Sequence, residues 1–263
     1  MLTPNNDGVW GQVEICTGGH DLTIIHEETY DNKSSESITL GWEPKQVRNR
    51  INKWTDNNLH FNTQKCWMPQ NWIMRTRKTY SELVKLKPLK RANLSIIVSN
   101  KGILEGHQFR KNLISEIGDL FPDKIDIWGT YCEGKNGHRF KGPCPPGENH
   151  KGIEPYRYYL SIENCKQDFY FSEKICVPFL FLTMPLYWGC PQIDRFFPKE
   201  SYILIDPSKR TEAERIIEIS NSSVREENIE YIKEAKSLVM NKYNSMATID
   251  MATRSDNLIR DFC

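Results

Sequence analysis

The sequence predicts an α/β protein with two Rossmann-like domains. Short apolar runs alternate with segments of helical spacing, which is the pattern of parallel βαβ units. A basic, polar stretch with a proline (KLKPLKRAN, residues 85–93) separates two such blocks. The 263 residues are enough for two modest domains. We therefore expect one domain over residues 1–88, a second over residues 89–245, and a helical tail over residues 246–263.

The N-terminal block contains two predicted strands and one predicted helix. The strands cover residues 22–26 and 37–41. The helix covers the segment EPKQVRNRINKW, in which Val47, Ile51 and Trp54 share one face. These elements predict a small α/β unit in front of the linker.

The C-terminal block has the clearer alternation. Helical spacing marks residues 107–117 and 173–182, and the chain is predicted to be helical again from Thr211. Residues 129–152 are rich in Gly, Pro and charge, so they predict a long loop. The predicted strands are residues 94–99, 124–128, 158–162, 185–188 and 202–205.

Ligands of open parallel sheets bind beyond the carboxyl ends of the strands. Applied to the C-terminal block, this rule selects four short segments that follow strands. They are Ser99 with Asn100, residues 129–131, Glu163 with Asn164, and Gly189 with Cys190. We expect these segments to surround one crevice.

The charge balance limits the classes of partner. Lys and Arg total 35 and Asp and Glu total 34, giving a net charge of +1, whereas proteins that coat nucleic acid or anionic membranes are usually more basic. No apolar run approaches the roughly 20 residues that span a bilayer, and the N-terminus MLTPNNDGVWG lacks the features of a signal peptide. The eight cysteines include no CxxC pair. We expect a soluble, cytoplasmic protein with reduced thiols and no nucleic-acid partner.

The predicted helix at residue 173 begins with an unusual residue. Ser172 is a plausible N-cap and Glu173 suits the first turn, but Lys174 opposes the helix dipole at a cost of about 0.3–1 kcal/mol. Two interpretations stay open. Lys174 is either a surface lysine directed into solvent, or it joins the helix amides in binding a phosphate or diphosphate.

A set of motifs over residues 156–206, about a fifth of the chain, resembles the signature of the α-1,3-fucosyltransferases. These are inverting enzymes that use GDP-fucose. Their signature has a strand ending in Phe-Glu-Asn and a helix that starts with Tyr-(Val/Ile)-Thr-Glu-Lys, followed by a (Val/Ile)-Pro-(Val/Ile)-X-(Trp/Leu)-Gly strand and an acidic-aromatic-Pro segment. The corresponding segments here are SIEN, YFSEK, MPLYWG and QIDRFFPKESYILID. Ser172 replaces the usual Thr and Ile162 the usual Phe, and both keep the expected role. Upstream, IIVSNKGILEGHQFRKNLI and IDIWGTYCEG show a weaker resemblance.

The resemblance implies a GT-B-like fold, in which an acceptor-side domain and a GDP-sugar-binding domain face a cleft. The partners would be GDP-fucose and a glycan acceptor. Arg110 and Lys174 would bind the donor diphosphate and neutralise the charge of the leaving GDP. Glu173 would bind the hydroxyls of the donor's sugar or ribose. The other expected donor-site residues are Asn100, Gly129, Glu163, Asn164, Tyr170 and Ser172.

Inversion at the anomeric carbon also requires a base, because the attacking hydroxyl must lose its proton. In the resembled family this carboxylate belongs to the N-terminal domain, at a strand end that faces the cleft. Glu43 is the preferred candidate, since it follows a predicted strand and precedes Pro44, which could open a helix. Glu43 could instead simply complement that helix dipole, and Glu27 and Glu28 occupy a similar setting.

Metal and cofactor requirements are expected to be absent. Cys132, His138, Cys144 and His150 would suit a tetrahedral zinc, but the short paired spacings typical of such sites are missing. Lys and Arg can take the place of a divalent ion at the diphosphate. A dinucleotide oxidoreductase would need a GxGxxG run, which the sequence lacks. Two alternatives stay open: a transferase for another GDP-sugar, and an inactive protein that binds nucleotide sugars or glycans.

Overall fold

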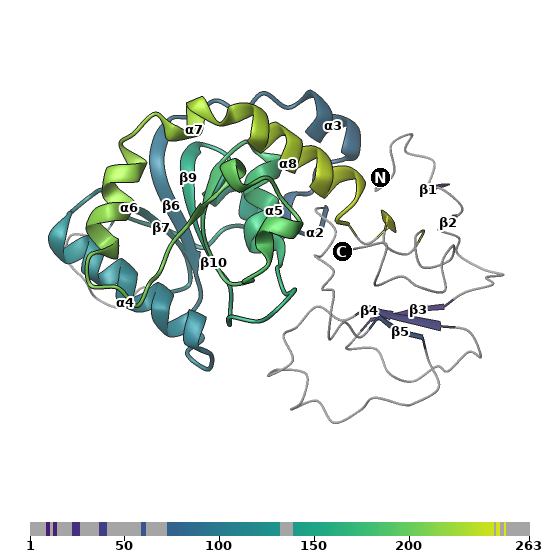
Figure 1. Ribbon diagram of the computed structural model, residues 1–263, viewed down its shortest axis with the longest axis horizontal. Helices are drawn as coiled ribbons and strands as arrows, with labels where there is room; N and C mark the ends of the chain where they lie inside the picture. The colour runs from purple at the N-terminus through teal and green to yellow at the C-terminus, as the bar shows by residue number, and fades with distance from the viewer. Residues whose placement is uncertain are drawn as a thin grey trace.

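The computed structural model describes residues 73–131, 139–244, 246–247 and 250, together with five short strands nearer the N-terminus (Figure 1). The predicted helix over residues 43–54 and most of the predicted tail lie outside the described residues. The same holds for Glu27, Glu28, Glu43, Cys132 and His138.

The N-terminal strands form two small sheets. β1 (Val9–Trp10) and β2 (Val13–Glu14) make an antiparallel pair. β3 (Thr23–His26), β4 (Ser37–Leu40) and β5 (Leu59–Phe61) form a parallel sheet with β4 in the centre. The two predicted strands of this block are therefore confirmed, and their parallel pairing fits the α/β prediction.

A six-stranded parallel sheet organises the C-terminal block, in the order β11-β10-β9-β6-β7-β8. The chain enters the sheet at the central strand β6 and continues outward through β7 to the edge strand β8. It then returns to β9 on the other side of β6 and continues to β11 at the opposite edge. This is the doubly wound order of a Rossmann sheet, and it confirms the predicted α/β class. The strands are β6 (Ala92–Val98), β7 (Asp126–Gly129), β8 (Arg139–Gly142), β9 (Tyr156–Ile162), β10 (Met184–Trp188) and β11 (Ile203–Leu204).

Helices cover both faces of this sheet (Figure 1). α4 (Glu105–Leu120) connects β6 to β7, and α5 (Glu173–Leu180) connects β9 to β10. The two crossovers run in opposite directions along the sheet, so right-handed connections put α4 and α5 on opposite faces. After β11 come α6 (Glu212–Ser220) beside α4, then α7 (Val224–Glu227), and α8 (Ile229–Asn241) beside α5.

None of the helices in the described part of the chain has both the length and the apolar character needed to cross a membrane.

Two short helices precede the linker and were not predicted. They are α2 (Ile73–Thr76) and α3 (Tyr80–Lys85). Lys236 Nζ of α8 donates to the carbonyl of Leu83 at 2.6 Å, and the Tyr80 hydroxyl donates to Asn241 Oδ1 at 2.7 Å. This segment therefore packs against the C-terminal sheet's helices, while the domain boundary at residue 88 stays a prediction.

The predicted loop over residues 129–152 is wrong in one part, because it contains the edge strand β8. This strand has no apolar pattern to reveal it. It pairs in parallel with β7, and two ion pairs join the same strands: Arg139 Nε lies 2.7 Å from Asp126 Oδ1, and Lys141 Nζ lies 3.7 Å from Asp126 Oδ2. A 3-10 helix, η1 (Asn149–Gly152), follows it.

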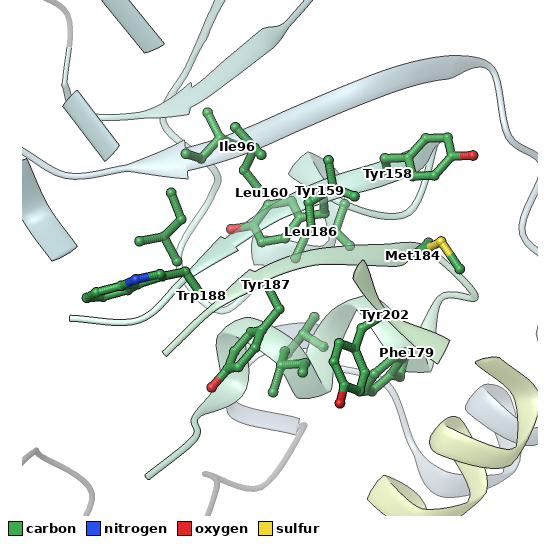
Figure 2. Close-up of a cluster of buried hydrophobic side chains, with 14 of the residues drawn as sticks. Ile96, Tyr158, Tyr159, Leu160, Phe179, Met184, Leu186, Tyr187, Trp188 and Tyr202 are labelled. Atoms are coloured by element: carbon green, nitrogen blue, oxygen red, sulfur yellow. The ribbon is translucent and has the colours of Figure 1, made fainter. Parts of the chain in front are cut away.

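The core lies on both sides of β9 and β10 (Figure 2). All five residues of β10 and six of the seven residues of β9 are buried. Figure 2 shows Tyr187, Tyr202 and Phe179 together between the sheet and α5, and the rings of Tyr187 and Tyr202 are 6.3 Å apart. A strand pair buried on both faces keeps its carboxyl ends in a fixed position, which is what a binding site at those ends requires.

Candidate functional site

A pocket of about 270 Å³ opens at the carboxyl ends of β6 and β9, where the strand order reverses. Its lining includes Ser99 and Lys101 from the segment after β6, and Asn164 from the segment after β9. Tyr159 of β9 also lines it, as does Arg75 of α2. The pocket therefore lies at the topological switch point, the usual ligand position of a doubly wound sheet.

Gly106 places the first turn of α4 directly on the end of β9. Its backbone N–H donates to the Asn164 carbonyl at 3.0 Å. A Cβ at position 106 would lie only 1.8 Å from the carbonyl oxygen of Glu163, so a larger residue would push the helix away. Because the turn sits this close, α4 presents His107 and Arg110 to the pocket.

Arg110 is a buried cation with unused hydrogen-bonding capacity. The residue is 6% exposed, and its Nε donates to the Gly106 carbonyl at 2.9 Å while Nη2 donates to Asn164 Oδ1 at 2.7 Å. Its burial lowers the pKa of the guanidinium. Within the described residues no carboxylate is at ion-pair distance from Arg110, since Glu163 and Glu173 pair with other cations. A guanidinium in this situation favours an anion in the pocket.

Glu163 fixes the beginning of α5 rather than lining the pocket. The residue is fully buried, and its carboxylate accepts from the backbone N–H of Ser172 at 2.8 Å and from the Ser172 hydroxyl at 2.7 Å. Burial raises the pKa of Glu163, with Lys174 opposing this effect. Ser172 in turn caps the helix, because its Oγ accepts from the backbone N–H of Lys174 at 3.3 Å. The predicted N-cap is therefore confirmed.

Lys174 lies between two carboxylates and not out in solvent. Its Nζ is 3.5 Å from Glu163 Oε2 and 3.5 Å from Glu173 Oε1, and the side chain is 17% exposed. The carboxylates compensate the cation at the positive end of α5. Lys174 also lines the pocket, so the same ammonium is available to a bound anion.

Glu173 is held in its ionised form by two cations. Burial alone would raise the pKa of Glu173, but Lys174 and Arg75 outweigh it and lower the pKa to about 2. Arg75 Nη2 is 3.7 Å from Glu173 Oε1. At neutral pH this carboxylate can accept hydrogen bonds from ligand hydroxyls, but it is a weak base.

Charge in the pocket favours an anionic ligand. Among the described residues, four cationic side chains line it and Glu173 supplies the one carboxylate; the cations come from α2, α4, α5 and the segment after β6. The cations are Arg75, Lys101, Arg110 and Lys174. Low local dielectric strengthens the attraction of such a cluster for a phosphate or diphosphate.

Of the nine predicted site residues that the structure describes, five line one pocket and four lie elsewhere. The five are Arg110, Asn164, Tyr170, Glu173 and Lys174. Glu163 and Ser172 lie behind the pocket wall as described above. Asn100 is exposed, and its carbonyl accepts from Lys111 Nζ at 3.2 Å.

Gly129 does not line the pocket, and its backbone geometry explains why this residue is glycine. Its φ is +111°, in the region that favours glycine. A Cβ there would lie 2.0 Å from the carbonyl oxygen of Val98 on the neighbouring strand. The close approach of β7 to β6 therefore accounts for this glycine.

The sequence analysis missed three basic residues that line the pocket: Arg75, Lys101 and His107. His107 had a usable signal, since it precedes Arg110 by three residues and so shares its helix face. Lys101 directly follows the Ser-Asn strand end. Arg75 had none, because only the packing of α2 brings it to the pocket.

The two described members of the Cys/His set do not form a metal site by themselves. The His150 ring stacks on Phe181 with centroids 5.4 Å apart, and Cys144 is half-buried. Across the described residues, no group of three or more His, Cys, Asp or Glu side chains could hold a metal ion. Cys132 and His138 are not among those residues.

Replacing Glu163 should destabilise the protein strongly. Glu163→Ala removes the acceptor of two buried donors and leaves Lys174 with one carboxylate fewer, so we expect a loss of about 3 kcal/mol and a fall in Tm of about 6–12 °C. Glu163→Gln keeps the volume and one acceptor, so its Tm should fall less. Thermal unfolding checks this, with Glu230→Ala on the exposed face of α8 as a control. Equal Tm values for Glu163→Ala and wild type would contradict the anchoring role.

Comparisons with known proteins agree with the motif analysis. The model of the glycosyltransferase family 10 (fucosyltransferase) C-terminal domain matches residues 87–247. A search of curated protein sequences finds no significant match.

Similar solved structures include an alpha1,3-fucosyltransferase with GDP (15% identity, 85% of this chain and 72% of that chain, TM-score 0.44). A second alpha1,3-fucosyltransferase structure is 16% identical over 79% of this chain and 57% of that chain, with a TM-score of 0.41. A mutant of the T4 phage protein BGT in complex with UDP-glucose is 13% identical over 83% of this chain and 61% of that chain, with a TM-score of 0.47. This chain thus spans little more than half of the length of the second of these fucosyltransferase structures.

Proposed function

Because the chain belongs to glycosyltransferase family 10, we propose that it transfers fucose from GDP-fucose to a glycan hydroxyl with inversion, in the manner of an α-1,3-fucosyltransferase. The observation that carries this proposal is the environment of Arg110. A buried guanidinium without a carboxylate partner in the described residues faces a pocket at the switch point, with Lys174 lining the same pocket. An incoming diphosphate would supply the missing counter-charge.

The proposed roles follow from the contacts of each side chain. Arg110 and Lys174 bind the diphosphate and neutralise the negative charge that develops on the leaving GDP. Glu173, ionised and partly exposed, accepts hydrogen bonds from hydroxyls of the donor. Asn164 orients Arg110 through its Oδ1, and Tyr170 forms part of the pocket wall.

Four cationic side chains at the pocket allow the leaving group to be stabilised without a divalent ion. We therefore expect transfer to continue in EDTA. Loss of activity in chelator that Mg²⁺ or Mn²⁺ restores would contradict this part of the proposal.

A nucleotide screen tests the proposed donor. A ligand at a concentration of about 100 times its dissociation constant adds roughly 2.7 kcal/mol to the free energy of unfolding. GDP and GDP-fucose at such concentrations should therefore raise Tm by about 5–10 °C. UDP-glucose serves as the control and should leave Tm unchanged. A preference for UDP-glucose would overturn the proposal.

The same screen, together with an activity assay, also tests the two alternatives, which are a transferase for another GDP-sugar and an inactive binding protein. GDP-mannose tests for another GDP-sugar, since a larger Tm rise than with GDP-fucose would change the sugar but keep the nucleotide. A protein that binds GDP-fucose but neither transfers nor hydrolyses it across a panel of glycan acceptors would be an inactive binding protein.

A further inference from the structure

His107 occupies the pocket beside the diphosphate-binding residues, yet the motifs assign it nothing. It lies on α4, three residues before Arg110 and on the same face of the helix. The residue is 6% exposed and is part of the pocket lining. Buried polar side chains are normally hydrogen-bonded, so each ring nitrogen of this imidazole should have a partner in the protein or in a ligand.

The hydrogen bond of Nδ1 determines which ring nitrogen carries the proton. The backbone N–H of Leu104 donates to His107 Nδ1 at 3.0 Å. Nδ1 is therefore an acceptor, so the proton of the neutral ring is on Nε2. Within the described residues Nε2 has no hydrogen-bond partner, which leaves one donor of a buried side chain unused.

The surroundings keep this ring uncharged. Burial lowers the pKa of His107 to about 4, and the nearby cations act in the same direction. These cations come from three elements: Arg110 and Lys111 on α4, Lys174 on α5, and Lys101 after β6. At neutral pH His107 adds a donor to the pocket without adding a further positive charge.

From this geometry we propose that His107 is a third binding residue for the diphosphate and donates from Nε2 to a phosphate oxygen beside Arg110 and Lys174. The inference rests on the proposed function. It assigns two tasks to one ring: Nδ1 orders the start of α4, and Nε2 contacts the ligand.

Two substitutions separate these tasks. His107→Asn keeps an acceptor at the position of Nδ1 and removes the donor, whereas His107→Gln keeps a donor near the position of Nε2 and removes the acceptor at Nδ1. We expect calorimetry at pH 7.5 to show GDP affinity about tenfold or more lower for His107→Asn and within about threefold of wild type for His107→Gln. Without ligand, His107→Gln should have the lower Tm of the two.

Each other outcome has a defined meaning. The reverse pattern, in which His107→Gln loses GDP affinity and His107→Asn does not, would show that the ring only orders the helix. Unchanged affinity in both variants, or equal losses in both, would also overturn the inference. Wild-type protein that binds no GDP would reject the proposed function itself, so the two failures are distinguishable.

Discussion

Arg110→Ala should lower GDP affinity about 100-fold or more while the protein remains folded. The guanidinium uses two donors on Gly106 and Asn164, and its other donors are left for the ligand. Removing a buried cation that has no carboxylate partner in the described residues removes an unfavourable burial cost, so the free energy of unfolding should change little without ligand. The loss should therefore appear in binding, and calorimetry with GDP measures it.

The controls for this prediction come from the same chain. Lys233→Ala removes a positive charge from the exposed face of α8, where Lys233 pairs with Glu230 at 2.7 Å, and it should leave GDP affinity unchanged. Arg110→Lys keeps the charge but not the planar fork, so it should recover only part of the affinity. If Arg110→Ala bound GDP as well as wild type, the diphosphate would have to lie elsewhere.

Local signals explain which parts of the fold could be predicted. The start of α5 was predictable because Ser172 is a good cap and an apolar run follows it. β9 and β10 were predictable because both are rich in aromatic and aliphatic residues, as is typical of strands buried on both faces. β8 was not, because it pairs with β7 at the edge of the sheet without an apolar pattern, and its ion pairs with Asp126 depend on that pairing.

The site was predictable only to the extent that its residues follow strands or begin helices. The strand-end rule placed Glu163 and Asn164 together, but it could not show that Glu163 turns inward to Ser172 while Asn164 turns to Arg110. Arg75 reaches the pocket through tertiary packing, which no local pattern encodes. The structure also revises the interpretation of Lys174: its charge is already balanced by carboxylates before any ligand binds, so an anion would share this lysine with Glu163 and Glu173.

The described pocket also narrows the search for the catalytic base. Glu173 has a pKa of about 2, which makes it a weak base, and Glu163 is fully buried with its oxygens occupied by Ser172. Neither carboxylate suits the removal of a proton from an acceptor hydroxyl. We therefore expect the base to come from the N-terminal block, where Glu43 is the first candidate.

Glu43→Gln should reduce transfer about 1,000-fold or more and leave GDP affinity within about threefold of wild type, because a base acts on the acceptor and not on the nucleotide. Glu173→Gln should differ by weakening donor binding, since it removes a hydrogen-bond acceptor from the pocket. Steady-state kinetics with GDP-fucose, together with calorimetry of GDP, separate the two effects. Glu27→Gln and Glu28→Gln are matched controls, because each removes one carboxylate from the same block. If Glu43→Gln kept its turnover while one of these variants lost it, the base would be that residue instead.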